Sequence, residues 1–309
     1  MAFVKEYGLV AFGEALIDFI SKGEGLYQAN PGGAPFNLSV CAAKGGVKTA
    51  FIGKVGNDSF GKMLADTARK YGVDTKGMVL DDSRPTTHAF VTVNTDGDNG
   101  FAFCRDGCAD ASITVEEADA GLVRSSSLFH FGGLSLAVEP CKSALMHLLS
   151  VAAEEKISIS FDPNYRPFLW QDEKAFVNAC LSLPVKIQLL KVSENEARLL
   201  SGGSDLDKAM DILLGYAETV LITLGADGVM YGKGDKRGRV YGFPAAVKDT
   251  TGAGDIFLGS FIAGAVTLGR DVSRLSSEEI ESLALKACAI AAKSTEKEGA
   301  IPSIPEISF

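Results

Sequence analysis

The hydrophobic pattern of the chain alternates between short apolar runs and stretches in which apolar residues recur every three or four positions. The runs predict buried strands, and the stretches predict helices packed on them. After residue 127, the predicted strands cover residues 128–131, 157–161, 187–192 and 219–224, and the predicted helices lie near residues 139–154, 172–181 and 277–293 and after residues 193, 204 and 252. A small hairpin is predicted over residues 229–243. This alternation predicts a largely parallel sheet covered on both faces, a three-layer α-β-α sandwich.

The amino-terminal half contains two segments that interrupt this rhythm. Strands are predicted at residues 7–12 and 49–55, and helices at residues 35–44 and 58–71. Residues 14–34 add a second apolar run and a tight turn at residues 30–35, and residues 85–107 predict a hairpin around the polar residues 96–100. We interpret both segments as strands of a small β-sheet lid, inserted into a single α/β domain that spans residues 1–309.

Charge and composition exclude several classes of function. A formal net charge of −9 over 309 residues, without any run of Lys and Arg, argues against binding to nucleic acid or to a membrane surface. The start of the chain lacks a signal-peptide pattern, and the longest apolar run, residues 256–269, is too short to span a bilayer. We therefore expect a cytoplasmic protein. Six scattered cysteines and three separated histidines predict reduced structural thiols and no zinc site.

The chemistry of residues 248–255, Lys-Asp-Thr-Thr-Gly-Ala-Gly-Asp, is the most informative in the sequence. The small residues Gly252, Ala253 and Gly254 let backbone N–H groups face an incoming anion at the start of a predicted helix. Asp255 places a carboxylate beside this anion cradle, as a general base for phosphoryl transfer would require. A Gly-containing turn in which Asp255 only caps the helix explains the same residues.

Two familiar nucleotide-binding signatures are missing from the sequence. Neither G-x-x-x-x-G-K-[ST] nor a G-x-G-x-x-G after the first strand occurs. If the chain binds a phosphate, it must do so by another arrangement.

Four motifs resemble, in order and spacing, the ribokinase-like family of sugar kinases. They are Asn-Pro-Gly-Gly-Ala-Pro-Phe-Asn at residues 30–37, Asp-Pro-Asn-Tyr-Arg at 162–166, Thr-Leu-Gly-Ala-Asp-Gly at 223–228, and residues 249–255. Residues 53–56, 101–105 and 161–170 look most like bacterial and plant fructokinases. The resemblance covers nearly the whole chain. It implies a ribokinase-like fold and ATP-dependent phosphorylation of a sugar, above all of D-fructose to fructose 6-phosphate.

The resemblance also implies roles for individual residues at the sugar. Asp255 would deprotonate the sugar hydroxyl, and the amides of the cradle would stabilise the phosphoryl group in flight. The implied sugar-binding residues are Asp18, Gly32, Gly33, Asn37, Phe103, Arg105 and Arg166. For Asn37, a helix cap is the alternative interpretation.

The implied nucleotide site lies in the second half of the chain. The residues implied to bind ATP are Lys191, Ser193, Glu196, Thr223, Gly225 and Gly228. For residues 223–225 the alternative is a plain turn. Much of the family has Asn where this chain has Ser193, with Glu196 organising the hydration shell of Mg²⁺. Ser-x-x-Glu is equally a capping box, and the two interpretations are compatible.

The resemblance further implies a K⁺ ion beside the cradle and allows a homodimer through the lid. The K⁺ ligands would be mainly backbone oxygens around Asp249, Thr251, Ser294, Gly299 and Ser303.

Three alternatives to a fructokinase remain. The first two are a kinase for 2-keto-3-deoxygluconate and a nucleoside or riboside kinase, and the third is a sugar sensor without turnover. A sensor has no use for Asp255. The charge of Asp18 favours a neutral sugar, whereas Arg166 could clamp a carboxylate.

Overall fold

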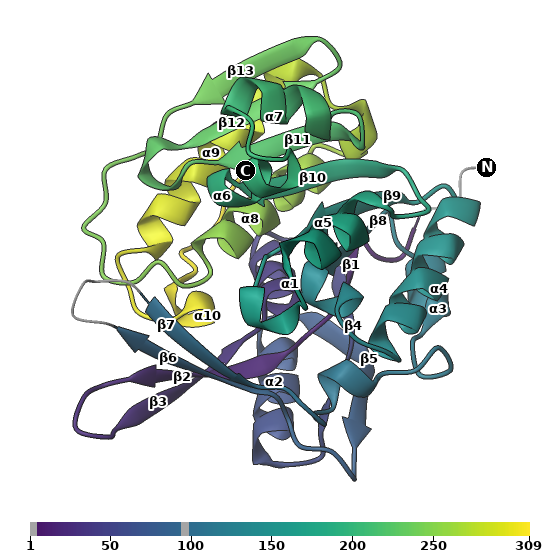
Figure 1. Cartoon of the computed structure of the whole chain (residues 1–309), viewed down its shortest axis with the longest axis vertical. Helices are drawn as coiled ribbons and strands as arrows, with labels where there is room; N and C mark the ends of the chain where they lie inside the picture. Colours follow the sequence, from purple (N-terminus) through teal and green to yellow (C-terminus); the bar gives the residue numbers. More distant parts are fainter. Residues whose placement is uncertain (1–4, 94–98) are drawn as a thin grey trace.

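The computed structural model describes residues 5–93 and 99–309. Its large sheet has, in this described part of the chain, the strand order β13 (Lys236–Val240), β12 (Val229–Lys233), β11 (Ala217–Thr223), β10 (Ile187–Ser193), β9 (Ser158–Asp162), β8 (Leu128–Gly132), β1 (Leu9–Phe12), β4 (Thr49–Gly56) and β5 (Val73–Asp81) (Figure 1). All neighbours from β11 to β5 pair in parallel, and β12 and β13 extend the sheet as an antiparallel hairpin. The carboxyl ends of the parallel strands therefore meet at one edge.

Helices cover both faces of this sheet. One face carries α3 (Ala120–Arg124), α4 (Cys141–Glu154), α5 (Glu173–Leu181), α6 (Glu194–Leu200) and α7 (Leu206–Leu213), and the other carries α1 (Ala34–Lys44), α2 (Ser59–Lys70), α8 (Ala253–Thr267) and α9 (Ser277–Ser294), followed by the short α10 (Ala300–Ser303). Successive side chains of a strand point to opposite faces of the sheet, so they pack against different sets of helices. In β1, Val10 and Phe12 pack under the first set of helices, whereas Leu9 and Ala11 pack under the second. This three-layer α/β arrangement confirms the predicted fold class.

A second, four-stranded sheet is built from the two interrupting segments. Its order is β3 (Tyr27–Gly32), β2 (Leu16–Ser21), β6 (His88–Val93) and β7 (Asn99–Cys104). Strands β2 and β6 pair in parallel, and the two outer pairs are antiparallel. The sheet extends from one edge of the main body (Figure 1). Part of the turn predicted at residues 96–100 lies outside the described residues.

Two local predictions differ from the structure. Residues 30–32 are not part of a tight turn but end β3, where Asn30 pairs with Asp18 of β2. The sharp change of direction falls on Gly33, at φ 106°. Glycine is needed there because of this φ and because a Cβ would lie 2.4 Å from the carbonyl oxygen of Glu14. Strand β5 was not predicted, since as an edge strand it is only partly buried and its polar residues hide the apolar pattern.

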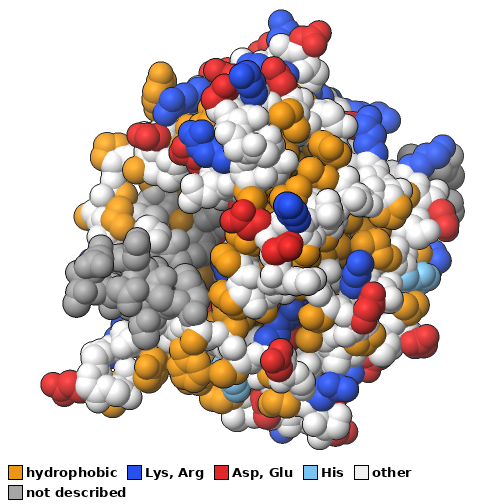
Figure 2. Space-filling model, viewed as in Figure 1, with side chains coloured by type: hydrophobic (Ala, Val, Ile, Leu, Met, Phe, Trp, Pro, Cys, Tyr) orange, Lys and Arg blue, Asp and Glu red, His pale blue; other side chains and the backbone are white. Residues whose placement is uncertain are grey.

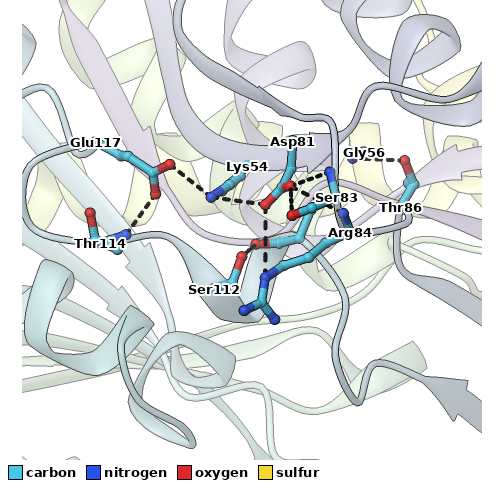
Figure 3. Close-up of polar contacts among 10 residues, drawn as sticks. Lys54, Gly56, Asp81, Ser83, Arg84, Thr86, Ser112, Thr114 and Glu117 are labelled. Carbon is cyan, nitrogen blue, oxygen red and sulfur yellow. Dashed lines mark hydrogen bonds and ion pairs between the residues drawn. The ribbon is translucent and has the colours of Figure 1, made fainter.

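A buried ion cluster lies where the chain leaves β5 towards the lid. The Nζ atom of Lys54 on β4 lies 2.9 Å from Asp81 Oδ2 and 2.7 Å from Glu117 Oε1 (Figure 3). Asp81 also accepts hydrogen bonds from the Ser83 backbone and hydroxyl and from the Arg84 N–H. The cluster thus joins β4 and β5 to the segment that follows the lid.

Charges of both signs are interspersed over the face of the molecule in Figure 2. Within residues 5–93 and 99–309, no helix combines the length and the apolar character needed to cross a membrane.

Candidate active site

A cavity of about 300 Å³ opens between the small sheet and the carboxyl ends of the parallel strands. Its walls come from the lid, from the ends of β1, β8, β9 and β10, and from the starts of α1 and α8. The lining residues are Glu14, Leu16, Asp18, Gly33, Ala34, Asn37, Phe103, Leu134, Asn164, Arg166, Lys191 and residues 250–255. Ligands of α/β proteins commonly bind at this edge of the sheet. The structure therefore brings most of the predicted sugar-binding residues and the cradle into one cavity.

The start of α8 has the predicted form of an anion cradle. Gly252 is its N-cap at φ 74°, and no side chain caps the helix. The N–H groups of Gly252 and Gly254 make no hydrogen bond within the described residues, whereas the Ala253 N–H donates to the Thr250 carbonyl at 3.1 Å. Of the three predicted amides, those of Gly252 and Gly254 are therefore available to an anion at this helix terminus.

The two glycines of the cradle lie close to neighbouring groups. A Cβ on Gly252 would lie 2.5 Å from the Cβ of Ala300, and one on Gly254 would lie 2.8 Å from the Nζ of Lys191. The second contact also places the Lys191 ammonium directly beside the helix start. A positive charge and a helix N-terminus therefore face the same part of the cavity.

Asp255 is buried in the first turn of α8, and its Oδ2 accepts a hydrogen bond from Asn37 Nδ2 at 2.9 Å. Burial and, next, the nearby Asp162 carboxylate raise the pKa of Asp255 to about 6, against the opposing effects of Asn37, Lys191 and Arg166. Both capping interpretations are wrong, because neither α1 nor α8 has a side-chain cap and Asn37 lies inside α1. The two side chains instead join across the cavity wall.

Asp18 is half-buried on β2 and faces the glycines that precede α1. A Cβ on Gly32 would lie 2.0 Å from Asp18 Oδ2, so glycine is what allows this carboxylate its position. Burial and the charge of Asp255 raise the pKa of Asp18 to about 7, and Arg166 opposes them. The cavity therefore contains two carboxyl groups that resist ionisation together.

Lys191 and Asp162 form a buried ion pair at the ends of the neighbouring strands β10 and β9, with Nζ 2.9 Å from Oδ2. Burial acts to lower the pKa of Lys191, but Asp162, Glu196 and Asp255 raise it above its ordinary value. The ammonium thus stays charged beside the cradle.

Arg105 does not line the cavity, in contrast to the prediction that it binds the sugar. Its guanidinium is buried, with Nε 2.7 Å from Asp110 Oδ2, and Nη1 donates to the Leu134 carbonyl at 3.2 Å. Asp110 also accepts a hydrogen bond from the Thr87 hydroxyl. Arg105 therefore ties the two ends of the β6–β7 hairpin together, and its charge is neutralised there.

The capping box predicted at the start of α6 is present. Ser193 Oγ accepts from the Glu196 N–H at 3.3 Å, and Glu196 Oε2 accepts from the Ser193 N–H at 2.7 Å. The other oxygen, Oε1, accepts from the Tyr165 N–H at 2.7 Å. Glu196 thereby fastens the segment that contains Asn164 and Arg166 against the end of β10. Glu196 itself does not line the cavity.

The other predicted nucleotide-binding residues follow β11, the next strand of the sheet. Thr223 ends β11, and a 3₁₀ turn, Gly225–Asp227, follows. A Cβ on Gly228 would lie 2.1 Å from the Val240 carbonyl oxygen, which explains glycine there as a close approach to β13. These residues lie outside the described cavity.

The segments expected to hold a monovalent cation lie together. The Asp249 carboxylate accepts hydrogen bonds from the Thr251 N–H at 2.9 Å and the Gly299 N–H at 2.8 Å, which joins the loop before the cradle to the start of α10. The Ser294 and Ser303 hydroxyls donate to carbonyl groups of their own helices. The described residues contain no cluster of three or more His, Cys, Asp or Glu side chains for a metal.

Glu14 is the one charged residue of the cavity that the sequence analysis did not single out. It lies two residues after the end of β1, is only 3% exposed, and accepts a hydrogen bond from the Ala34 N–H at 3.1 Å. Its place after a predicted buried strand was the signal in the sequence that could have identified it as a cavity residue.

Comparisons with known proteins identify the family of the chain. The model of the "pfkB family carbohydrate kinase" matches residues 8–307. Fructokinase-1 of Zea mays is 38% identical over 96% of this chain and 94% of its own, and Fructokinase-2 of Solanum lycopersicum is 37% identical over 97% and 94%. Among solved structures, a fructokinase with bound ATP from Xylella fastidiosa has a TM-score of 0.88 at 28% identity, covering 97% of this chain and 95% of the other.

A fructokinase double mutant from Vibrio cholerae O395, in a form with fructose, ADP and potassium ion bound, has a TM-score of 0.86 at 27% identity, covering 97% of this chain and 96% of the other. A family model that matches nearly the whole chain and relatives of this similarity establish the family. The chain belongs to the pfkB family of carbohydrate kinases, which confirms the expectation of an ATP-dependent sugar kinase.

Proposed function

We propose that this enzyme transfers the γ-phosphoryl group of ATP to the primary hydroxyl of a neutral ketohexose, D-fructose, and forms fructose 6-phosphate. The observation that carries the proposal is the placement of Asp255, held by Asn37 at 2.9 Å, in one cavity with the α8 amides and the half-buried Asp18. The fructokinase relatives and the fructose-bound structural neighbour support the same substrate.

Each part of the cavity has a role in this reaction. Asp255 accepts the proton of the attacking hydroxyl, and its carboxylate is oriented for this by Asn37. The free N–H groups of Gly252 and Gly254 stabilise the charge on the transferring phosphoryl group, and Lys191 adds its positive charge beside them. Asp18 and Asn37 hydrogen-bond other sugar hydroxyls, and Gly33 and Phe103 shape the wall.

The charge of the cavity favours a neutral sugar over a sugar acid. Glu14, Asp18 and Asp255 all line it, and a substrate carboxylate would have to lie among them. Of the two arginines expected near the sugar, Arg105 is paired with Asp110 and does not line the cavity. Arg166 does line it, and this single observation keeps 2-keto-3-deoxygluconate as the second candidate substrate.

ATP supplies the phosphoryl group, and we propose that it lies along the ends of β10 and β11. Thr223, Gly225 and Gly228 would border its ribose and phosphates, and Ser193 the phosphates. Glu196 would orient the water shell of Mg²⁺ through lone pairs that its two backbone contacts leave free.

We further propose that K⁺ binds beside the cradle, and that two copies of the chain associate through the lid in the cytoplasm. In the presence of Mg²⁺, replacing K⁺ by tetramethylammonium at matched ionic strength should strongly reduce turnover. Equal rates in the two salts would contradict the K⁺ site. Size-exclusion chromatography with light scattering would test the dimer, and a monomer at working concentration would contradict it.

A coupled ADP-release assay across a panel of sugars tests the substrate. The panel should include D-fructose, D-ribose, a nucleoside and 2-keto-3-deoxygluconate, and the position of the phosphate in the product should be determined by NMR. We expect D-fructose to give the highest kcat/KM and the 6-phosphate as product. ADP release that is independent of every sugar, or a preference for another class, would contradict the proposal.

A further inference from the structure

The position of Glu14 connects three walls of the cavity. It follows β1, its Oε1 accepts the first N–H of α1, from Ala34, at 3.1 Å, and its other oxygen faces the end of β8. A Cβ built on Gly132 at that end would lie 3.8 Å from Glu14 Oε2. The side chain is thus aimed at the junction of β1, β8 and α1, where the order of the strands changes direction and ligands commonly bind.

One carboxyl oxygen of Glu14 has no partner. Glu14 is 3% exposed, and its buried Oε2 atom makes no hydrogen bond within the described residues. Leaving a buried polar atom unpaired is unfavourable, so a ligand that pairs with it gains from the arrangement. The helix N-terminus explains the position of Oε1 but not that of Oε2.

Arg105 acts on the charge of Glu14 but makes its contacts elsewhere. Arg105 is committed to Asp110 at 2.7 Å and to the Leu134 carbonyl at 3.2 Å. Burial raises the pKa of Glu14 to about 7, although its backbone contacts and Arg105 oppose the rise. At neutral pH the group is therefore present as a carboxylate, which accepts hydrogen bonds, and as an acid, which also donates one.

Resting on the proposed function, we propose that Glu14 is a further sugar-recognition residue, whose Oε2 pairs with a hydroxyl group of the substrate other than the one phosphorylated. A sugar offers hydroxyl groups that donate and accept, which matches an oxygen in either protonation state. Such a buried contact also discriminates, because a substrate without the hydroxyl leaves Oε2 unpaired.

The test compares wild type with the Glu14→Gln variant on D-fructose and on analogues that each lack one hydroxyl group. Gln retains an oxygen for the Ala34 N–H but replaces Oε2 by an NH₂ group, so a hydroxyl that donates loses its acceptor. We expect kcat/KM for the full sugar to fall roughly tenfold to hundredfold, mainly through KM. On the one analogue that lacks the paired hydroxyl, the two enzymes should agree within about twofold. Glu155→Gln, an exposed site, is the matched control and should behave as wild type.

Two results would overturn this assignment. The first is equal kcat/KM of Glu14→Gln and wild type on the full sugar, and the second is an equal loss on every analogue, which a purely structural contact to α1 would give. If Gln prevents folding, Glu14→Asp keeps a carboxylate but withdraws it by one methylene, and the same analogue pattern decides. If wild type prefers another sugar, the series is built on that sugar, so that a wrong substrate and a wrong role for Glu14 are distinguished.

Discussion

The Lys54 cluster and the cavity both contain buried carboxyl groups, but the surroundings shift the pKa of Asp81 in the cluster and the pKa values of the cavity groups in opposite directions. Asp81 and Glu117 share the Lys54 ammonium at 2.9 and 2.7 Å. Despite the opposing effect of burial, the contacts of Asp81 with Ser83 and Lys54 hold its pKa well below its usual range. In the cavity, burial is the largest effect on Glu14, Asp18 and Asp255, and it raises the pKa of each.

This difference separates a structural site from a functional one. A carboxylate that is fully paired holds segments together and has no capacity left for a ligand. A carboxyl group whose pKa is raised by burial destabilises the empty protein, but it can bind a hydroxyl or remove a proton. The Lys54 cluster fixes the segments on either side of the lid (Figure 3). The carboxyl groups of the cavity remain available for binding and proton transfer.

Replacing Asp255 by Asn should produce the largest effect on function. General-base transfer is typically worth about 10²–10⁴ in rate, so kcat should fall by that factor. ATP binding, measured by calorimetry, should change little, and the urea midpoint should not fall. Retention of half the activity would remove Asp255 from the mechanism.

Replacing Lys54 by Met should produce the largest effect on stability. The change leaves Asp81 and Glu117 without their cation, and breaking such a buried pair costs about 3–5 kcal/mol. Lys48→Met is the matched control, because its pair with Glu6 is exposed and worth less than about 1 kcal/mol. Urea unfolding measures both. A Lys54→Met protein as stable as the control would show that the cluster is not structural. Because Lys54 lies outside the catalytic cavity, kcat of the folded variant should stay within about threefold of wild type.

The pH profile of kcat/KM should report the raised pKa values of the carboxyl groups in the cavity. Asp255 must be ionised to accept a proton, so activity should rise with pH and level off above its pKa of about 6. Below that pKa, the rate should fall by about tenfold per pH unit, and the protonation of Asp18, with a pKa of about 7, should broaden the limb. A limb near pH 4, the usual region of Asp, would contradict the raised pKa of the base.

Much of this account was accessible from the sequence, because it depends on local patterns. The apolar periodicity predicted the layered sheet. Gly252 to Asp255 predicted the cradle and its base, since small residues at a helix N-terminus leave its N–H groups open to an anion. The resemblance added the sugar-binding side of the cavity. These features are carried by residues that are adjacent or regularly spaced.

Side-chain pairings between distant segments could not be predicted. Arg105 ends a segment that looks like fructokinases, and only the fold reveals that Asp110 neutralises it. The Asn37–Asp255 contact joins residues 218 positions apart. The Ala253 N–H is engaged by Thr250 through a turn that the sequence does not fix. In each case tertiary contact, rather than residue type, decides which groups remain free.

The ratio of kcat/KM for D-fructose to that for 2-keto-3-deoxygluconate, measured on one preparation, tests the central claim most directly. The claim is that a cavity lined by Glu14, Asp18 and Asp255 receives a neutral sugar. The repulsion between these carboxyl groups and a substrate carboxylate is strong in a cavity closed to water. We predict a ratio of at least about tenfold in favour of D-fructose, the discrimination that about 1.4 kcal/mol provides. A ratio of tenfold or more in favour of the acid would contradict the account and identify Arg166 as a carboxylate clamp.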